Sequence, residues 1–107
     1  MKRISYKNDL EICFDKIKPF INICKITGKE ELCNITIRYI PNEYILEIGS
    51  YREYFNKVFN EYIEDICSNV YDELNSLLQP LELEVIVYLE EGEGLTPWRV
   101  KKISKKI

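Results

Sequence analysis

The sequence predicts a single α+β domain spanning residues 1–107, with the order strand, strand, helix, helix, strand, strand. Two segments indicate the strands, because apolar residues occupy alternate positions around residues 33–40 and again around residues 83–89. A third segment between them indicates the helices, because its apolar residues recur at helical spacing. A chain of 107 residues is long enough for one compact core and too short for two.

The first predicted strand pair lies between about residues 18 and 41. Ile35 and Ile37 alternate with polar residues in its second strand, which is typical of a half-buried strand. Residues 18–26 indicate a weaker strand or an extended segment. The polar stretch that joins the two contains Gly28 and predicts a turn.

The helical part follows Ser50 and is expected to be one bent helix or two consecutive helices. Ser50 is the expected cap, and Glu53 three residues later would complete a capping box. Gln79 and Pro80 mark the end of the helical part. The apolar residues at helical spacing are Tyr51, Phe55, Val58, Phe59, Tyr62, Ile63, Ile66, Val70 and Leu74.

Two further strands are expected after the helices. Leu83, Val85 and Val87 recur at every second position, which predicts the first of them. The sequence EEGEG at residues 90–94 predicts a turn, and residues 96–103 form the last strand.

The composition narrows the chemistry that the chain can perform. It contains no histidine, so the commonest general base, Ser-His or Cys-His dyads and histidine metal ligands are excluded. The four cysteines form no CxxC pair, which favours reduced thiols over a disulfide scaffold. No signal peptide and no run of roughly 20 apolar residues is evident, so we expect a cytoplasmic protein without a membrane partner. An enzyme this small often builds its site between subunits, which predicts a homo-oligomer.

Cys24 is the candidate nucleophile among the four cysteines. Most cysteines are small buried side chains, and packing is expected to explain Cys13, Cys33 and Cys67. Cys24 differs because it precedes the polar turn, where a thiol can face solvent and meet carboxylates and backbone N–H groups.

Two acidic positions could contribute a carboxylate to this thiol. Glu31, expected on the same turn as Cys24, could carry protons, although an exposed turn carboxylate is the simpler interpretation. Glu64 and Asp65 in the helical segment could lie near a subunit boundary, although a surface salt bridge is simpler there. The residues alone therefore indicate a thiol-and-carboxylate site without a specific reaction.

The order of these residues resembles the nitrile reductases of queuosine biosynthesis. In that family a Cys-Pro-x-Thr-Gly-x-x-Asp motif leads into a strand ending in Tyr-Ile-Pro-Asp-Glu, followed by Glu-Ser-Lys-Ser-Leu-Lys. The resemblance extends more loosely through the helices, where Glu64-Asp65 falls near the family's Phe-His-Glu-Asp. The matching residues here are Cys24, Thr27, Gly28, Glu31, the sequence ITIRYIPNE and Glu47.

The departures from that motif favour a relative of the reductases over a reductase. Residues 47–52 lack the lysines that would meet a nicotinamide dinucleotide phosphate, and Ile63 stands in place of the family's histidine. A thiol and carboxylates remain, as in the QueF-like amidinotransferases that complete archaeosine on tRNA. The alternatives are residual nitrile reduction and a noncatalytic tunnelling-fold module that binds a base or tRNA.

The resemblance implies that Cys24 attacks the nitrile of 7-cyano-7-deazaguanine in the D-arm of tRNA, and that ammonia displaces the resulting thioimide. It implies Glu31 as the proton carrier, and Glu64 with Glu47 and Ile48 as contacts to the base. It implies no cofactor and no metal, because the zinc-dependent relatives rely on histidine ligands. The implied fold is the tunnelling fold, whose antiparallel sheets close into a cyclic barrel of pentameric rings stacked as a decamer.

Basic residues near the end of the sequence form the candidate tRNA-binding surface. The net charge of −3 argues mildly against a nucleic-acid partner, but a ring of subunits would repeat the basic residues around a rim. The simpler interpretation is a solubilising strand end. These residues are Arg99, Lys101, Lys102, Lys105 and Lys106.

Overall fold

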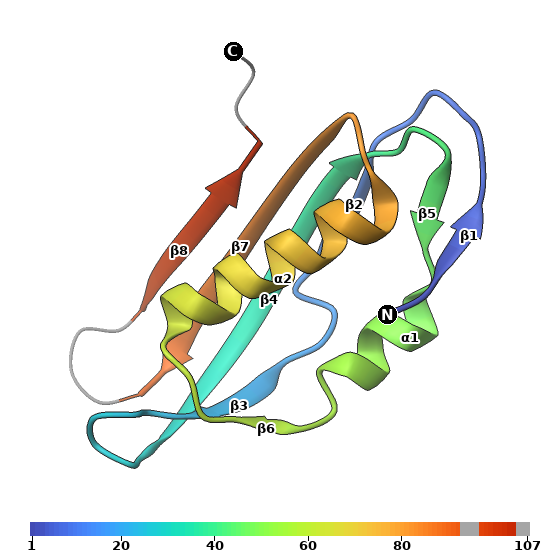
Figure 1. Ribbon diagram of the computed structural model, residues 1–107. Coiled ribbons are helices and arrows are strands. Elements are labelled where there is room, and N and C mark those ends of the chain that lie inside the picture. Colours follow the sequence, from blue (N-terminus) through green and yellow to red (C-terminus); the bar gives the residue numbers. More distant parts are fainter. Residues whose placement is uncertain (93–96, 105–107) are drawn as a thin grey trace.

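The computed structural model describes residues 1–92 and 97–104, and it confirms the α+β class (Figure 1). Four of its strands, β1, β2, β5 and β6, were not expected from the sequence. The elements in chain order are β1 (Arg3–Ser5), β2 (Ile12–Asp15), β3 (Phe20–Ile23), β4 (Glu30–Ile40), β5 (Tyr44–Leu46), α1 (Ile48–Tyr54), β6 (Val58–Phe59), α2 (Ile63–Leu78), β7 (Glu82–Glu91) and β8 (Trp98–Ile103).

The main sheet has the strand order β6-β3-β4-β7-β8, and β2 pairs with the second half of β4. β1 and β5 form a separate two-stranded ribbon. The long strands β4 and β7 form the centre of the main sheet, where Ile35 lies opposite Val87 and Ile37 opposite Val85. These four side chains are fully buried, as the apolar positions of both strands predict, but Thr36 and Ile86 between them are buried as well, so the strands are not half-buried there. The expectation of a purely antiparallel sheet is wrong at one edge, because β3 and β6 pair in parallel.

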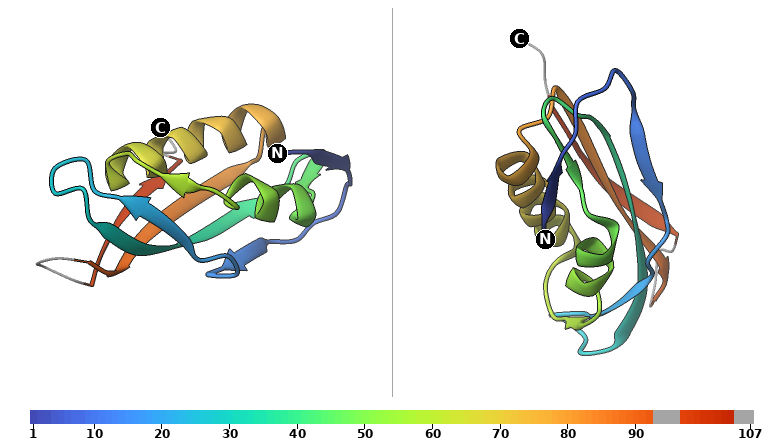
Figure 2. Two further views of the ribbon diagram at one scale, coloured as in Figure 1. Left: turned by 90° about the horizontal axis from the view of Figure 1, so that it is seen from below. Right: turned by 90° about the vertical axis from the view of Figure 1, so that its right-hand side faces the viewer.

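α2 lies across one face of the main sheet (Figure 2). Its buried residues recur at helical spacing from Ile63 to Leu78, as the sequence predicts for this part. The helix ends before Pro80, because Gln79 takes a left-handed conformation with φ 46° and donates its N–H to the carbonyl of Asn75. Within the described part of the chain, no helix is long and apolar enough to span a bilayer. The predicted turn at residues 90–94 lies partly outside the described residues.

The predicted helical segment is interrupted between residues 55 and 62. α1 ends at Tyr54, and Val58 and Phe59 form β6 instead of a helical turn. Tertiary contacts explain the difference, because β3 offers backbone partners to β6 and the ring of Phe59 packs 5.0 Å from that of Phe20. Val58, expected on the buried helical face, is 64% exposed. Spacing alone could not distinguish a helix from a turn followed by a short strand.

Glu47, rather than Ser50, caps α1. The carboxylate oxygens of Glu47 accept hydrogen bonds from the N–H groups of Gly49 and Ser50, at 2.9 and 2.6 Å. Ser50 lies inside the helix, where its hydroxyl donates to the carbonyl oxygen of Glu47. The capping box expected between Ser50 and Glu53 is therefore wrong, because a carboxylate three residues earlier already satisfies the free N–H groups.

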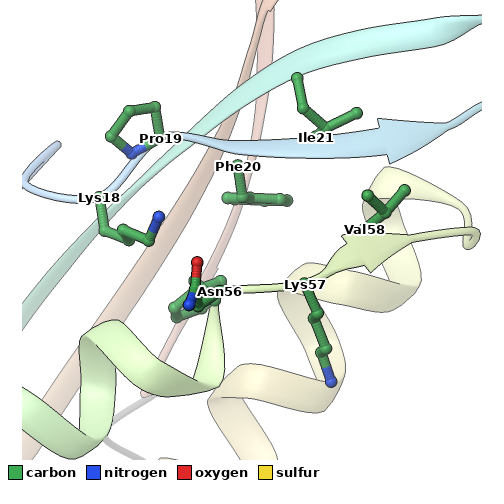
Figure 3. Close-up of a pocket in the computed structure, with 8 residues that line it drawn as sticks. Lys18, Pro19, Phe20, Ile21, Asn56, Lys57 and Val58 are labelled. Carbon is green, nitrogen blue, oxygen red and sulfur yellow. The ribbon is translucent and has the colours of Figure 1, made fainter.

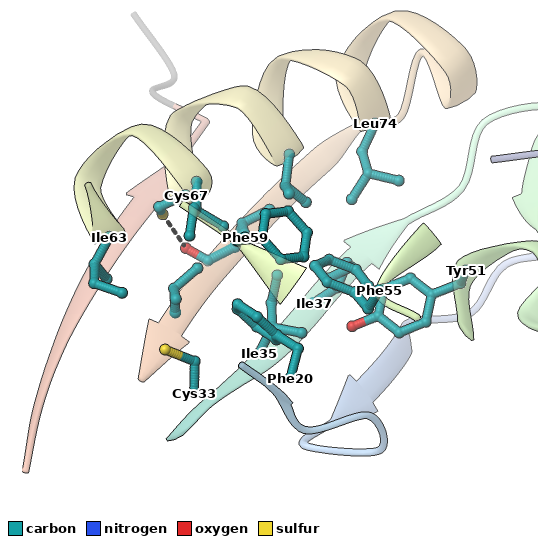
Figure 4. Packing of buried hydrophobic residues seen from close by; sticks show 14 of the residues in the cluster. Phe20, Cys33, Ile35, Ile37, Tyr51, Phe55, Phe59, Ile63, Cys67 and Leu74 are labelled. Atoms are coloured by element: carbon teal, nitrogen blue, oxygen red, sulfur yellow. Dashed lines mark hydrogen bonds between the residues drawn. The ribbon is translucent and has the colours of Figure 1, made fainter. Parts of the chain in front are cut away.

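An aromatic cluster fills the core between α1, β3 and β6 (Figure 4). The ring centroids of Phe20 and Phe55 lie 5.2 Å apart, and that of Tyr51 lies 5.1 Å from Phe55. Cys33 on β4 and Cys67 on α2 are buried in the same core. Packing therefore explains both cysteines, as expected.

Candidate active site

Cys24 follows the last residue of β3 and begins a tight turn that leads to β4. The N–H of Gly28 donates to the carbonyl of Cys24 at 2.9 Å, and the N–H of Cys24 donates to the carbonyl of Lys29 at 2.9 Å. Gly28 has a φ of 73°, a conformation that side chains with a Cβ disfavour. The turn predicted at Gly28 is confirmed, and it leaves the Cys24 thiol half-buried at the end of β3.

Donors within this turn stabilise the Cys24 thiolate. The hydroxyl of Thr27, followed by the backbone N–H groups of Thr27 and Ile26, lowers the pKa of the Cys24 thiol, because hydrogen bonds to the charged form favour it. Partial burial and the negative charge of Glu31 raise the pKa by smaller amounts. The thiolate, which is the reactive form of cysteine, is therefore favoured at Cys24.

The other three cysteines have surroundings that disfavour the thiolate. Burial raises the pKa of Cys33 to about 12 and also raises the pKa of Cys67. Cys13 is exposed, contrary to the expectation of packing, because it alternates on β2 with Ile12 and Phe14, which pack against the core. Partial burial, followed by neighbouring acidic charges, raises the pKa of Cys13 as well.

Glu31 lies on β4 and not on the turn where it was expected. It pairs with Asn22 across the two strands, and the Asn22 side-chain Nδ2 donates to Glu31 Oε1 at 2.9 Å. The interpretation as an exposed turn carboxylate is wrong, because Glu31 is half-buried. Its negative charge raises the pKa of the Cys24 thiol, so the two groups are electrostatically coupled.

The thiol of Cys24 and the candidate carboxylates Glu31 and Glu64 line one cavity of about 210 Å³. Cys24 reaches it from the turn after β3, Glu31 from β4 and Glu64 from the first turn of α2. Segments far apart in the sequence thus bring together three residues that the family motif pointed to. Asp65, which follows Glu64, does not line this cavity.

Several lining residues could not be identified from the sequence. Tyr62, expected to face the core, occupies the N-cap position of α2 and is 48% exposed. The Nζ of Lys25 lies 5.5 Å from its ring centroid. Glu61 belongs to the connection between β6 and α2, and Trp98 is the first residue of β8. No local pattern marks Glu61 or Trp98, because both reach the cavity only through the tertiary fold.

No family model matches this chain, but individual proteins do. The NADPH-dependent 7-cyano-7-deazaguanine reductase of Chlorobium chlorochromatii is 35% identical over 79 residues, which cover 72% of this chain and 68% of that relative. The reductase of the same description from Aquifex aeolicus is 38% identical over 79 residues, which cover 72% of this chain and 59% of that relative. The chain belongs to the 7-cyano-7-deazaguanine reductase family.

A solved structure shares the fold over nearly the whole chain. The archaeosine synthase QueF-Like in its apo form matches with a TM-score of 0.79, covering 94% of this chain and 99% of that chain. The sequences are 14% identical, so this match shows a shared fold and not a shared activity.

Glu47 and Ile48 do not line the Cys24 cavity within one chain of this reductase-family member. The carboxylate of Glu47 is the α1 cap, and the hydrogen bonds from Ser50 and then Gly49 lower its pKa. Ile48 is the first residue of α1 and is 48% exposed. The fold therefore separates these two predicted base contacts from the Cys24 cavity of the same chain.

The fold divides the predicted basic cluster. Arg99 and Lys101 on β8 are exposed, whereas the Nζ of Lys102 lies 3.0 Å from the Ser68 hydroxyl and 3.0 Å from the Asp72 carboxylate. The charge of Lys102 is thus partly compensated by α2. Lys105 and Lys106 lie outside the described residues.

A second depression, of about 340 Å³, lies between β3 and the segment after α1 (Figure 3). Lys18, Asn56 and Lys57 are among the residues that line it, but neither a thiol nor a carboxylate lines it. Among residues 1–92 and 97–104, no group of three or more cysteine, aspartate or glutamate side chains could hold a metal ion. The cavity at Cys24 is the candidate active site because a thiol and carboxylates line it together.

Proposed function

We propose that this protein is an amidinotransferase that converts the nitrile of 7-cyano-7-deazaguanine in tRNA into the formamidine of archaeosine. The observation that supports it most is the Cys24 cavity, where a thiol with a lowered pKa lies with Glu31 and Glu64. The relatives indicate the substrate class, because the sequence matches are 7-cyano-7-deazaguanine reductases and the structural match is an archaeosine synthase.

Cys24 supplies the covalent step in this proposal. Its sulfur attacks the nitrile carbon, one π bond of the nitrile breaks, and the thiol proton reaches the nitrile nitrogen through Glu31 to give a thioimide. Ammonia then adds to the same carbon, the C–S bond breaks, and one proton of the added ammonia returns to the sulfur, so that the amidine leaves and the thiol is regenerated. The net reaction joins a nitrile and ammonia into an amidine, so it needs neither an oxidant nor a reductant.

Glu64 is the proposed contact to the base. A carboxylate can accept two parallel hydrogen bonds from the ring N–H and the exocyclic amine of a guanine-like edge, and the exposed Glu64 lines the cavity. Tyr62 offers an aromatic surface in the same cavity on which a base can stack. Glu47 and Ile48 would join this site from a neighbouring chain of a cyclic assembly.

Nitrile reduction is the second candidate, because the sequence relatives are reductases. Reduction needs a hydride donor, yet residues 47–52, which take the place of the reductases' lysine motif, contain no lysine. Ile63 stands in place of the family's histidine. Its hydrocarbon side chain cannot supply a proton, and it is buried, with 4% exposure. These differences favour ammonia transfer over reduction.

Intact-mass analysis with 7-cyano-7-deazaguanine tests the proposal. We expect a covalent adduct of one base on Cys24, its release as the amidine on addition of ammonium, and the same conversion on tRNA that carries the nitrile base. Cys24→Ala should abolish the adduct, and Cys33→Ala is the matched control that should keep it. An adduct that survives in Cys24→Ala would contradict the nucleophile. Oxidation of NADPH that depends on Cys24 would establish the reductase, and base binding without an adduct would indicate a noncatalytic module.

A further inference from the structure

The structure assigns to Asn22 the role of a positioning residue that holds Glu31 toward Cys24 and joins both to the start of α2. This inference rests on the proposed function in one respect, which is that Glu31 carries the proton to the nitrile nitrogen. Asn22 does not line the cavity, so it would act through Glu31 and not on the substrate.

Asn22 is a fully buried polar residue on β3, two positions before Cys24. Cys24 begins the turn directly after β3, and its side chain lines the same cavity as Glu31. The amide makes three hydrogen bonds. Its Nδ2 donates to Glu31 Oε1 and to the carbonyl of Glu61, both at 2.9 Å, and its Oδ1 accepts from the N–H of Glu61 at 3.0 Å.

The backbone of Glu61 fixes which way the Asn22 amide points. A backbone N–H can only donate, so the amide oxygen must face it. The NH₂ group must then face the Glu61 carbonyl and the Glu31 carboxylate. Glu31 thus receives a directed hydrogen bond from inside the protein, which favours the rotamer facing Asn22 over one that turns to solvent.

One side chain thereby connects the three segments that supply the candidate active-site groups. β3 leads to Cys24, β4 carries Glu31, and Glu61 lies three residues before Glu64. The two bonds to Glu61 would suffice if Asn22 only stabilised the fold. The bond to Glu31 is the one that a purely structural role does not need, so the test is aimed at it.

The first experiment needs no nitrile substrate. The pH dependence of iodoacetamide alkylation at Cys24 is measured in a Cys13→Ser background, because the exposed Cys13 would be alkylated as well. Glu31→Gln should lower the midpoint, since the negative charge of Glu31 raises the pKa of the Cys24 thiol. Asn22→Ala should shift the midpoint in the same direction by at least half as much, because the released carboxylate turns to solvent. Adding Asn22→Ala to Glu31→Gln should cause no further shift.

Asn22→Ser is the second variant, in case Asn22→Ala does not fold. The serine side chain ends one atom earlier than the amide, so it loses the bond to Glu31 but keeps a polar group at this buried position, and the same midpoint shift is expected. Thr36→Val is the matched control, because it removes another part-buried side-chain hydrogen bond of β4, at 2.9 Å to Asp15, and should leave the midpoint unchanged. An unchanged midpoint in a folded Asn22 variant, additive shifts in the double variant, or unfolding of both Asn22 variants would overturn the positioning role.

The second experiment links Asn22 to the proposed reaction. Asn22→Ala should slow formation of the nitrile adduct by about tenfold or more, while alkylation by iodoacetamide, which needs no proton delivery, should not slow. Equal rates of adduct formation in Asn22→Ala and the parent would overturn the role in proton delivery. If the parent protein forms no adduct, the proposed function fails, and the alkylation midpoints still decide whether Asn22 positions Glu31.

Discussion

Replacing Phe59 by alanine tests β6, the short strand that separates α1 from α2. Phe59 is 4% exposed, and its ring centroid lies 5.0 Å from that of Phe20 and 5.9 Å from that of Phe55. Truncation of a buried phenylalanine to alanine costs about 3–5 kcal/mol, a large part of the roughly 5–15 kcal/mol that stabilises a typical domain. Val58 is its neighbour on β6 but is 64% exposed, so Val58→Ala should change the free energy of unfolding by under about 0.5 kcal/mol.

Urea unfolding followed by circular dichroism at a fixed chain concentration measures both free-energy changes. With a typical slope of about 1–3 kcal/mol per molar urea, Phe59→Ala should lower the unfolding midpoint by about 1 M or more. A second series at a higher chain concentration separates folding from association. Equal losses in the two variants would refute the reasoning, because they would place Val58 and Phe59 on one buried helical face.

Three further predictions concern the site, the tRNA surface and the assembly. Thr27→Val removes the hydroxyl that does most to lower the pKa of the Cys24 thiol. The pKa of Cys24 should rise, so iodoacetamide should alkylate the variant more slowly than the parent at neutral pH and equally fast at alkaline pH. Equal rates at neutral pH would contradict the role of the Thr27 hydroxyl. Lys101→Ala should weaken tRNA binding and flatten the slope of log affinity against log salt concentration by about one unit. Lys102→Ala should have a smaller effect, because Lys102 forms an ion pair with Asp72 on α2. Filter binding across a salt series compares the two variants. Light scattering should report a multiple of the chain mass, since strand edges tend to find partners, and a fully active monomer would contradict the proposed ring.

The sequence was sufficient to predict the long elements of the fold and not the short ones. β4, β7 and α2 each contain enough residues for a period of two or 3.6 to be recognised, and their buried faces are the predicted ones. β1, β5 and β6 have three residues or fewer, too few to show any period. They form because another segment of the chain offers them backbone partners, which is information that no local pattern contains.

The same limit applies to the candidate site. Cys24 and Glu31 could be proposed because a family motif fixes their spacing, and the structure places them on adjoining segments of one cavity. The contribution of Asn22 could not be predicted, because its amide bonds the backbone of Glu61, 39 positions later in the chain. An asparagine in an otherwise apolar strand was the available signal, since a buried amide needs partners for its hydrogen bonds.

In the proposed reaction, Cys24 and Glu31 share the proton transfer that an imidazole could perform, because the chain contains no histidine. Thr27 and its neighbours lower the pKa of the Cys24 thiol, whereas the charge of Glu31 raises it. When a thiol adds to a nitrile, no proton is gained or lost overall. The proton that leaves the sulfur must therefore be held nearby and delivered to the nitrile nitrogen. A carboxylate that turned to solvent would leave the thiolate more stable but would give the proton to water. A fixed position of Glu31 should therefore matter more for protonating the nitrogen than for forming the nucleophile, which is why alkylation and adduct formation should respond differently to the loss of Asn22.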